Sequence, residues 1–169
     1  MCHFVFVGVP EKRRHVLERE LTAAGLRVDA VRNPWILAAF PPTDSVAVVT
    51  LGGCSCGIYG SPDAAFNEAA ERQKLRKKKW SERKIDRAVL GKRRPDGPLL
   101  VRFRSAFTQI VRQCSGARLL AHFFSGSVDD EELPIRGQNT LSLAQFLAQD
   151  GRYQANVVQH VTAFEVATG

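Results

Sequence analysis

The sequence predicts an α+β fold: a single domain spanning residues 1–169, with a mixed, mostly antiparallel sheet of about five strands flanked by helices. The chain length suits one domain with one hydrophobic core. An apolar fraction of 44% and a charged fraction of 24% are ordinary for a globular protein. Segments with strand periodicity and segments with helix periodicity do not alternate strictly, which argues against a regular βαβ winding.

The N-terminal part predicts three strands and one helix. Residues 3–9 are apolar on both alternating faces, as in a strand covered on both sides. Pro10 then opens a helix that Gly25 is placed to end. A second strand is expected within residues 27–39, and the β-branched run at 45–51 predicts a central strand.

The middle of the chain is expected to be helical. Ser61, followed by proline and aspartate, has the features of a helix start. Over residues 72–83 the apolar spacing degrades, so this part is expected to be a projecting helix or a loop outside the core. Residues 85–90 restore a short apolar helix, and the sequence at 93–97 predicts a break.

The C-terminal part predicts two helices and two strands. Apolar residues recur at helical spacing over residues 103–114, which indicates an amphipathic helix. A strand is expected at 118–124, followed by a polar, acidic loop. Ser142 and Gln145 form a capping-box pattern that predicts a short helix. Alternation across residues 152–164 predicts a long final strand.

Nothing in the sequence indicates a secreted or membrane protein. The chain begins without the basic region and small-residue cleavage site of a signal peptide. No stretch approaches the roughly 20 apolar residues needed to span a bilayer. A cytoplasmic location, reduced cysteines and no membrane insertion are therefore expected. The glycines at 52–60 match neither the dinucleotide fingerprint nor the P-loop, so no cofactor is expected.

A basic segment at residues 72–94 dominates the charge of the chain. It holds twelve Lys or Arg residues against two acidic ones, whereas the rest carries twelve basic and fifteen acidic residues. Such a segment is typical of polyanion binding, with nucleic acid or an acidic protein as partner, and Trp80 would offer a stacking face for an unpaired base. Alternatively, the acidic residues 129–132 partly neutralise this charge within the protein. The predicted polyanion-binding residues are Lys74, Arg76, Lys77, Lys78, Lys79, Trp80, Arg83, Lys84 and Arg87.

Two cysteines, Cys54 and Cys56, lie in a glycine-rich stretch directly after the predicted central strand. Exposed backbone amides in such a turn lower the pKa of a thiol and stabilise an oxyanion. A cysteine nucleophile also needs a base, and His122 and His160 are the candidates. The alternative function is therefore a cysteine-dependent amide hydrolase or deamidase that uses Cys54. In a simpler interpretation, the cysteines fill small buried spaces beside a tight turn.

A metal site is a further alternative for the same cysteines. Tetrahedral zinc needs four ligands, and Cys2 with His3 would complete the set with Cys54 and Cys56 if the first and third predicted strands run antiparallel. No spacing motif supports this site, so no metal is expected.

Two short stretches resemble known proteins. The opening MCHF together with GGCSCGIYG at 52–60 resembles a group of bacterial proteins that begin Met-Cys-aromatic, carry Cys-Ser-Cys and have no assigned activity. This resemblance implies a bacterial cytosolic domain. LGGC at 51–54 is similar to the Leu-Ser-Gly-Cys of Cys-His glutamine-deamidating toxins, which implies Cys54 as the nucleophile. Gly52 stands here in place of the toxins' serine.

Overall fold

The computed structural model describes residues 2–51, 53–55, 57–59, 68–92, 98–149 and 152–164 of the 169-residue chain. These residues form an α+β fold with a mixed sheet, as the sequence predicts, and the sheet has six strands rather than about five. No helix within these ranges is long and apolar enough to cross a membrane. The predicted helix start at Ser61 and the predicted break at 93–97 lie outside the described residues.

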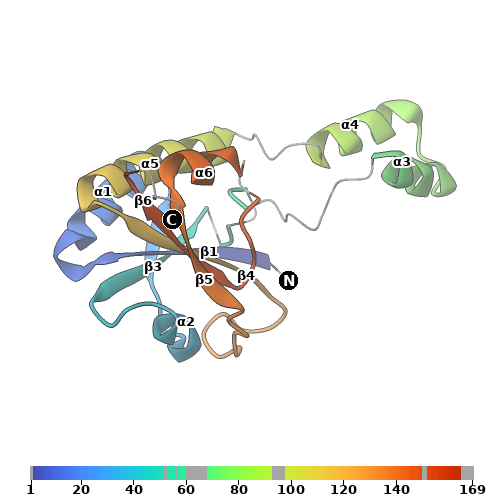
Figure 1. The fold of residues 1–169 in the computed structure, drawn as a ribbon. Coiled ribbons are helices and arrows are strands. Elements are labelled where there is room, and N and C mark those ends of the chain that lie inside the picture. Colours follow the sequence, from blue (N-terminus) through green and yellow to red (C-terminus); the bar gives the residue numbers. More distant parts are fainter. Residues whose placement is uncertain are drawn as a thin grey trace.

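The strands form one sheet in the order β2-β3-β1-β4-β6-β5 (Figure 1). Neighbouring strands are antiparallel except β5 and β6, which run parallel. The sheet is therefore mostly antiparallel, as predicted. The strands are β1 (Cys2–Pro10), β2 (Arg27–Ala30), β3 (Asp44–Thr50), β4 (Ala117–Phe124), β5 (Gly137–Ser142) and β6 (Val157–Thr162).

Helices cover both faces of the sheet: α1, α5 and α6 lie on one face and the short α2 on the other (Figure 1). The capping box predicted at Ser142 and Gln145 is present at the start of α6. The bounds are η1 (Glu11–Arg13), a 3-10 turn that leads into α1 (Arg14–Ala23), then α2 (Pro34–Ala38), α5 (Pro98–Cys114) and α6 (Leu143–Ala148).

The first four strands have the connectivity of a split βαβ unit. β1, α1 and β2 are followed by β3, α5 and β4, and β1 lies between β3 and β4 in the sheet. α1 and α5 pack together on the same face. This strand order and helix placement are those of a ferredoxin-like arrangement. α2 is an insertion into this unit, and β5, α6 and β6 extend the sheet beyond β4.

β1 is central and is buried on both faces, as its apolar alternation predicts. On one face, Val5 belongs to a buried cluster with Leu17 of α1 and Phe107 of α5. On the other face, Phe6 belongs to a second cluster with Ile36 of α2. The sheet therefore separates two cores, and side chains at successive positions of β1 pack alternately into one core and the other.

Three regions differ from the sequence-based prediction. The strand expected within 27–39 is confined to β2, because the side chain of Asn33 accepts a hydrogen bond from the N–H of Trp35 at 2.9 Å and caps α2. The long strand predicted at 152–164 is reduced to β6, because Asn156 has a φ of 62° and interrupts the extended backbone. β5 is not predicted by the sequence, since its residues are mostly polar and it forms the edge of the sheet.

Candidate functional site

Two helices, α3 (Glu68–Lys77) and α4 (Glu82–Lys92), form a pair that stands apart from the sheet (Figure 1). They pack on each other through a small cluster in which Leu75 and Ile85 are buried, with Trp80 and Ala88 partly buried against them. The two clusters on the sheet do not include these residues. The projecting segment that the sequence predicts is therefore a helical hairpin with a core of its own, called here the α3–α4 hairpin.

The connection between the two helices is short and closely hydrogen-bonded. Lys79 takes a left-handed conformation with a φ of 56°, and the N–H of Trp80 donates to the carbonyl of Leu75 at 3.3 Å. This is the arrangement of a Schellman cap, which ends α3. The carbonyl of Ser81 then accepts from the N–H of Ile85 at 2.9 Å and begins α4. The turn thereby folds α4 back along α3.

Ion pairs link the two helices along one flank. Nε of Arg76 lies 2.8 Å from Oε1 of Glu82, and Nη1 of Arg72 lies 2.7 Å from Oδ1 of Asp86. The hydrogen bond between Arg76 and Glu82 lowers the pKa of the Glu82 carboxyl and raises that of Arg76. Both residues are exposed, so this contact adds little stability. It does commit Arg76, a predicted polyanion-binding residue, to a contact within the hairpin.

The remaining cations with described side chains lie on another side of α3, in the turn and at the start of α4. Lys74 and Lys77 of α3 and Lys78 just after it follow a spacing of three and four, so they share one side, whereas Arg72 and Arg76 lie on another side. Six cations of the hairpin are exposed and form no ion pair with any carboxylate of the described residues. These are Lys74, Lys77, Lys78, Lys79, Arg83 and Lys84, called here the lysine flank. Arg87 belongs to α4, but its side chain lies outside the described part.

Trp80 packs within the hairpin. Its ring lies against the buried Leu75 and Ile85, and Nζ of Lys84 lies 4.2 Å from the ring centroid. A cation over the ring face is a stabilising arrangement. This packing favours a structural role for Trp80 over the base-stacking role that the sequence suggests.

The acidic residues 129–132 do not neutralise the hairpin among the described contacts. The carboxylate of Glu131 accepts hydrogen bonds from the N–H groups of Gly126 and Ser125 at 2.6 and 3.1 Å. Asp130 accepts from the hydroxyl of Ser127 at 3.1 Å. Asp130 and Glu131 therefore organise their own loop, and none of the acids at 129–132 forms an ion pair with the lysine flank among the described residues.

The cysteine-containing loop folds against the start of β1. The N–H of Leu51 donates to the carbonyl of Cys54 at 3.0 Å, and the N–H of Ser55 donates to the carbonyl of His3 at 2.9 Å. The Ser55 hydroxyl accepts from the N–H of Val5 at 2.9 Å and donates to the carbonyl of Val49. Ser55 is buried, so this residue between the two cysteines fastens the loop to β1 and β3. The sequence-based prediction overlooks it.

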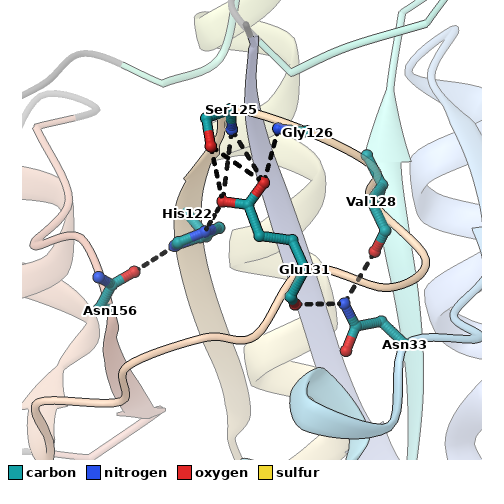
Figure 2. A network of polar contacts seen from close by, with 7 residues as sticks. All are labelled: Asn33, His122, Ser125, Gly126, Val128, Glu131 and Asn156. Carbon is teal, nitrogen blue, oxygen red and sulfur yellow. Dashed lines mark hydrogen bonds and ion pairs between the residues drawn. The ribbon is translucent and has the colours of Figure 1, made fainter.

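His122 is held on β4 by two polar neighbours. Its Nδ1 is hydrogen-bonded to Oδ1 of Asn156, and its Nε2 lies 3.6 Å from Oε1 of Glu131 (Figure 2). The second distance is within ion-pair range but too long for a hydrogen bond, which leaves the buried Nε2 without a hydrogen-bond partner. Both ring nitrogens thus face groups other than a cysteine.

His160 lies toward the opposite end of β1 from the cysteine loop. It is paired with Arg118 in the register of β4 and β6, and Arg118 is paired with Gly8. The cysteine loop contacts His3, five residues away along β1, or about 16 Å at the usual rise of a strand. Burial, followed by the charge of Arg118, lowers the pKa of His160. The structure therefore does not bring His160 and Cys54 together.

The suggested metal ligands are split between the two faces of the sheet. Cys2 and His3 are successive residues of β1, so their side chains point to opposite faces. The ring of His3 lies 4.3 Å from that of Tyr59 and 4.8 Å from that of Phe123, measured between centroids. Within the described residues, no group of three or more His, Cys, Asp or Glu side chains is placed to hold a metal ion. Cys56 lies outside this part.

Comparison of the chain with known protein families, with curated proteins and with solved structures finds no match.

Proposed function

We propose that the α3–α4 hairpin binds the phosphate backbone of a nucleic acid. The observation that carries the proposal is the separation of charges within the hairpin: Arg72 and Arg76 pair with Asp86 and Glu82, while the lysine flank carries exposed cations with no described acidic partner. Concentrated positive charge repels itself unless an anion or solvent compensates it. Phosphate backbones present negative charge at the density that suits such a surface.

The composition of the lysine flank favours binding that is independent of sequence. Five of its six cations are lysines, which act as point charges and contact phosphates without the planar fork by which arginine recognises bases. The packing of Trp80 under Lys84 also favours phosphate contacts over base stacking. The expected partner is therefore any accessible strand or duplex, bound through its backbone.

The salt dependence of binding tests the proposal. If all six cations of the lysine flank contact phosphates, log K should fall with log salt with a slope of about −4 for a single strand and about −5 for a duplex. Reversal of Lys77, Lys78 and Lys79 to glutamate should reduce that slope by about half or more and weaken binding to labelled RNA and DNA, measured by fluorescence anisotropy.

A matched variant separates the hairpin from general charge. Lys12, Arg32 and Arg102 are exposed cations of the sheet domain, and their reversal to glutamate changes the net charge by the same amount. This second variant should retain most of the binding. Equal losses in both triple variants, or binding that does not respond to salt, would contradict the proposal. Polyglutamate that displaces RNA at equal charge concentration would instead identify an acidic protein as the partner.

A further inference from the structure

A polar cavity lies between the β5–β6 pair and the C-terminal end of α6. Its volume is about 400 Å³, which is within the range of small-molecule sites. Ala155 is the one apolar residue among its described lining residues. The polar ones are Arg136, Asn139, Gln149, Arg152, Gln154 and Gln159. A lining of arginines and carboxamides without aromatic groups suits a small, hydrophilic ligand rather than a nucleobase or a lipid chain.

Gln159 and Asn139, which line the cavity, each carry a buried hydrogen-bond acceptor that has no partner. Gln159 is 1% exposed, and its Nε2 donates to Oε1 of Gln149 at 3.2 Å. Its own Oε1 is buried without a hydrogen bond. Asn139 lies beside Gln159 in the parallel register of β5 and β6, and its Oδ1 is also buried and unbonded. Buried acceptors without donors are costly, so both carboxamides gain hydrogen bonds if they turn toward ligand O–H or N–H groups in the cavity that they line.

The rim of the cavity carries two arginines whose backbone is anchored by hydrogen bonds. The N–H of Arg136 donates to the carbonyl of Asn156 at 2.8 Å, and the N–H of Arg152 donates to the carbonyl of Gln149 at 2.9 Å. Both side chains are exposed, and in the described part of the chain neither guanidinium forms an ion pair. Arginine at such a position binds carboxylate or phosphate through paired hydrogen bonds.

We propose that this cavity binds a small organic anion with a hydroxylated skeleton, such as a sugar phosphate or a sugar acid. The anionic group lies between Arg136 and Arg152 at the rim, and the carboxamides of Gln159 and Asn139 turn toward the cavity to accept hydrogen bonds from the hydroxyl groups. The site is separate from the lysine flank and does not depend on nucleic-acid binding. The cavity lies where the parallel strands β5 and β6 begin and where α6, the helix that connects them, ends.

Calorimetric titration of the full chain with ribose 5-phosphate and with gluconate tests the proposal. Ribose and inorganic phosphate serve as the two halves of the proposed ligand. At least one of the hydroxylated anions should bind at least tenfold more tightly than inorganic phosphate, and ribose alone should bind more weakly still. Failure of both anions to bind at millimolar concentration, or equal affinity for inorganic phosphate, would overturn the assignment.

Variants at the rim locate the binding. Arg136→Gln and Arg152→Gln should each weaken binding about tenfold or more, because each removes a charge-assisted contact at an exposed position that folding does not require. Arg32→Gln, at a position just after β2 at the other edge of the sheet, should leave the affinity unchanged. The glutamate variant at Lys77, Lys78 and Lys79 should also leave it unchanged. Binding that survives both rim variants, or that is lost with the lysines, would overturn the assignment.

Discussion

Oε1 of Glu131 lies 3.6 Å from Nε2 of His122, and this contact connects the loop after β4 to the strand itself (Figure 2). The same carboxylate accepts the N–H of Gly126 at 2.6 Å. The backbone carbonyl of Glu131 accepts from Nδ2 of Asn33 at 2.9 Å. One residue therefore ties the loop at 125–136 to β4 through its side chain and to the start of α2 through its backbone.

Replacement of Glu131 by glutamine should change how the free energy of unfolding depends on pH in the acid range. The N–H of Gly126 chiefly lowers the pKa of the Glu131 carboxyl below its ordinary value of 4.5. A carboxyl with a lowered folded pKa contributes stability that is present above its ordinary pKa and is lost as the pH falls through the folded pKa. The wild type should therefore lose more stability below pH 4.5 than Glu131→Gln does, in urea unfolding at neutral pH and at about pH 3.

The control for this experiment is Glu132→Gln, which removes the neighbouring, exposed carboxyl of the same loop. The free energy of unfolding of this variant should fall at acid pH in the same way as that of the wild type. Identical pH dependence in the two variants would mean that the contacts of Glu131 carry no stability.

Asn156 combines a backbone and a side-chain requirement, and two substitutions separate them. Its φ is 62°, and its Oδ1 is hydrogen-bonded to Nδ1 of the buried His122. Asn156→Gly and Asn156→Ala both leave that nitrogen without its acceptor, which should cost about 1–3 kcal/mol. The alanine variant should be less stable than the glycine variant by about a further 1 kcal/mol, because a Cβ is strained in the left-handed region. Equal free energies of unfolding for the two variants would contradict this division.

The features that the sequence predicts correctly are those with a local cause. The periodic apolar residues of α5 and the capping box at Ser142 and Gln145 depend only on neighbours along the chain. β5 is different, because its residues are mostly polar and it becomes a strand by pairing with β6 at the sheet edge. Local periodicity does not encode such pairing, and tertiary context overrides propensity at edges.

The candidate sites show the same division. The basic composition of the hairpin is visible in the sequence, but the division into paired arginines and unpaired lysines appears only when α3 and α4 are side by side. Similarly, the contact between Asn156 and His122 joins residues 34 positions apart. The cavity beside Gln159 depends on the crossover through α6, which no spacing motif announces.

Ser55→Ala tests whether the serine between the two cysteines fixes their loop. The hydroxyl serves the buried N–H of Val5 and the carbonyl of Val49, and alanine would leave both without this partner. The expected loss is about 2 kcal/mol or more in the free energy of unfolding, measured with urea. Ser105→Ala, on an exposed position of α5, should change stability by less than about 0.5 kcal/mol. If Ser55→Ala loses no more stability than Ser105→Ala, Ser55 does not anchor the loop.

The cysteine-hydrolase interpretation makes a separate prediction about thiol reactivity. Burial raises the pKa of Cys114, so this residue should react slowly with iodoacetamide at neutral pH. A nucleophilic Cys54 must react faster than Cys114 and at a pH below the usual thiol pKa. Rates are measured for each cysteine by mass spectrometry of peptides across a pH series. Equal, slow labelling of both residues would end the hydrolase interpretation.

Ile85→Ala should separate the stability of the α3–α4 hairpin from that of the sheet. Ile85 is buried in the hairpin cluster, which it shares with Leu75, and truncation of such a residue costs about 2–5 kcal/mol. A two-helix unit with so small a core cannot absorb that loss, so the hairpin should unfold locally. The main thermal transition should stay where it is, because the clusters on the sheet do not include Ile85.

This variant also shows whether polyanion binding needs the hairpin folded or only charged. Ile85→Ala keeps every cation, so a phosphate-binding surface set by the flank of α3 should weaken, whereas attraction to a flexible basic chain should persist. Val101→Ala, at a position 57% exposed on α5, serves as the control for truncation. Hydrogen exchange at α3 and α4 reports the local unfolding, and anisotropy reports the affinity. If the Ile85→Ala variant exchanges the amide hydrogens of α3 and α4 rapidly but keeps full affinity, charge density alone, rather than the arrangement of the lysine flank, binds the polyanion.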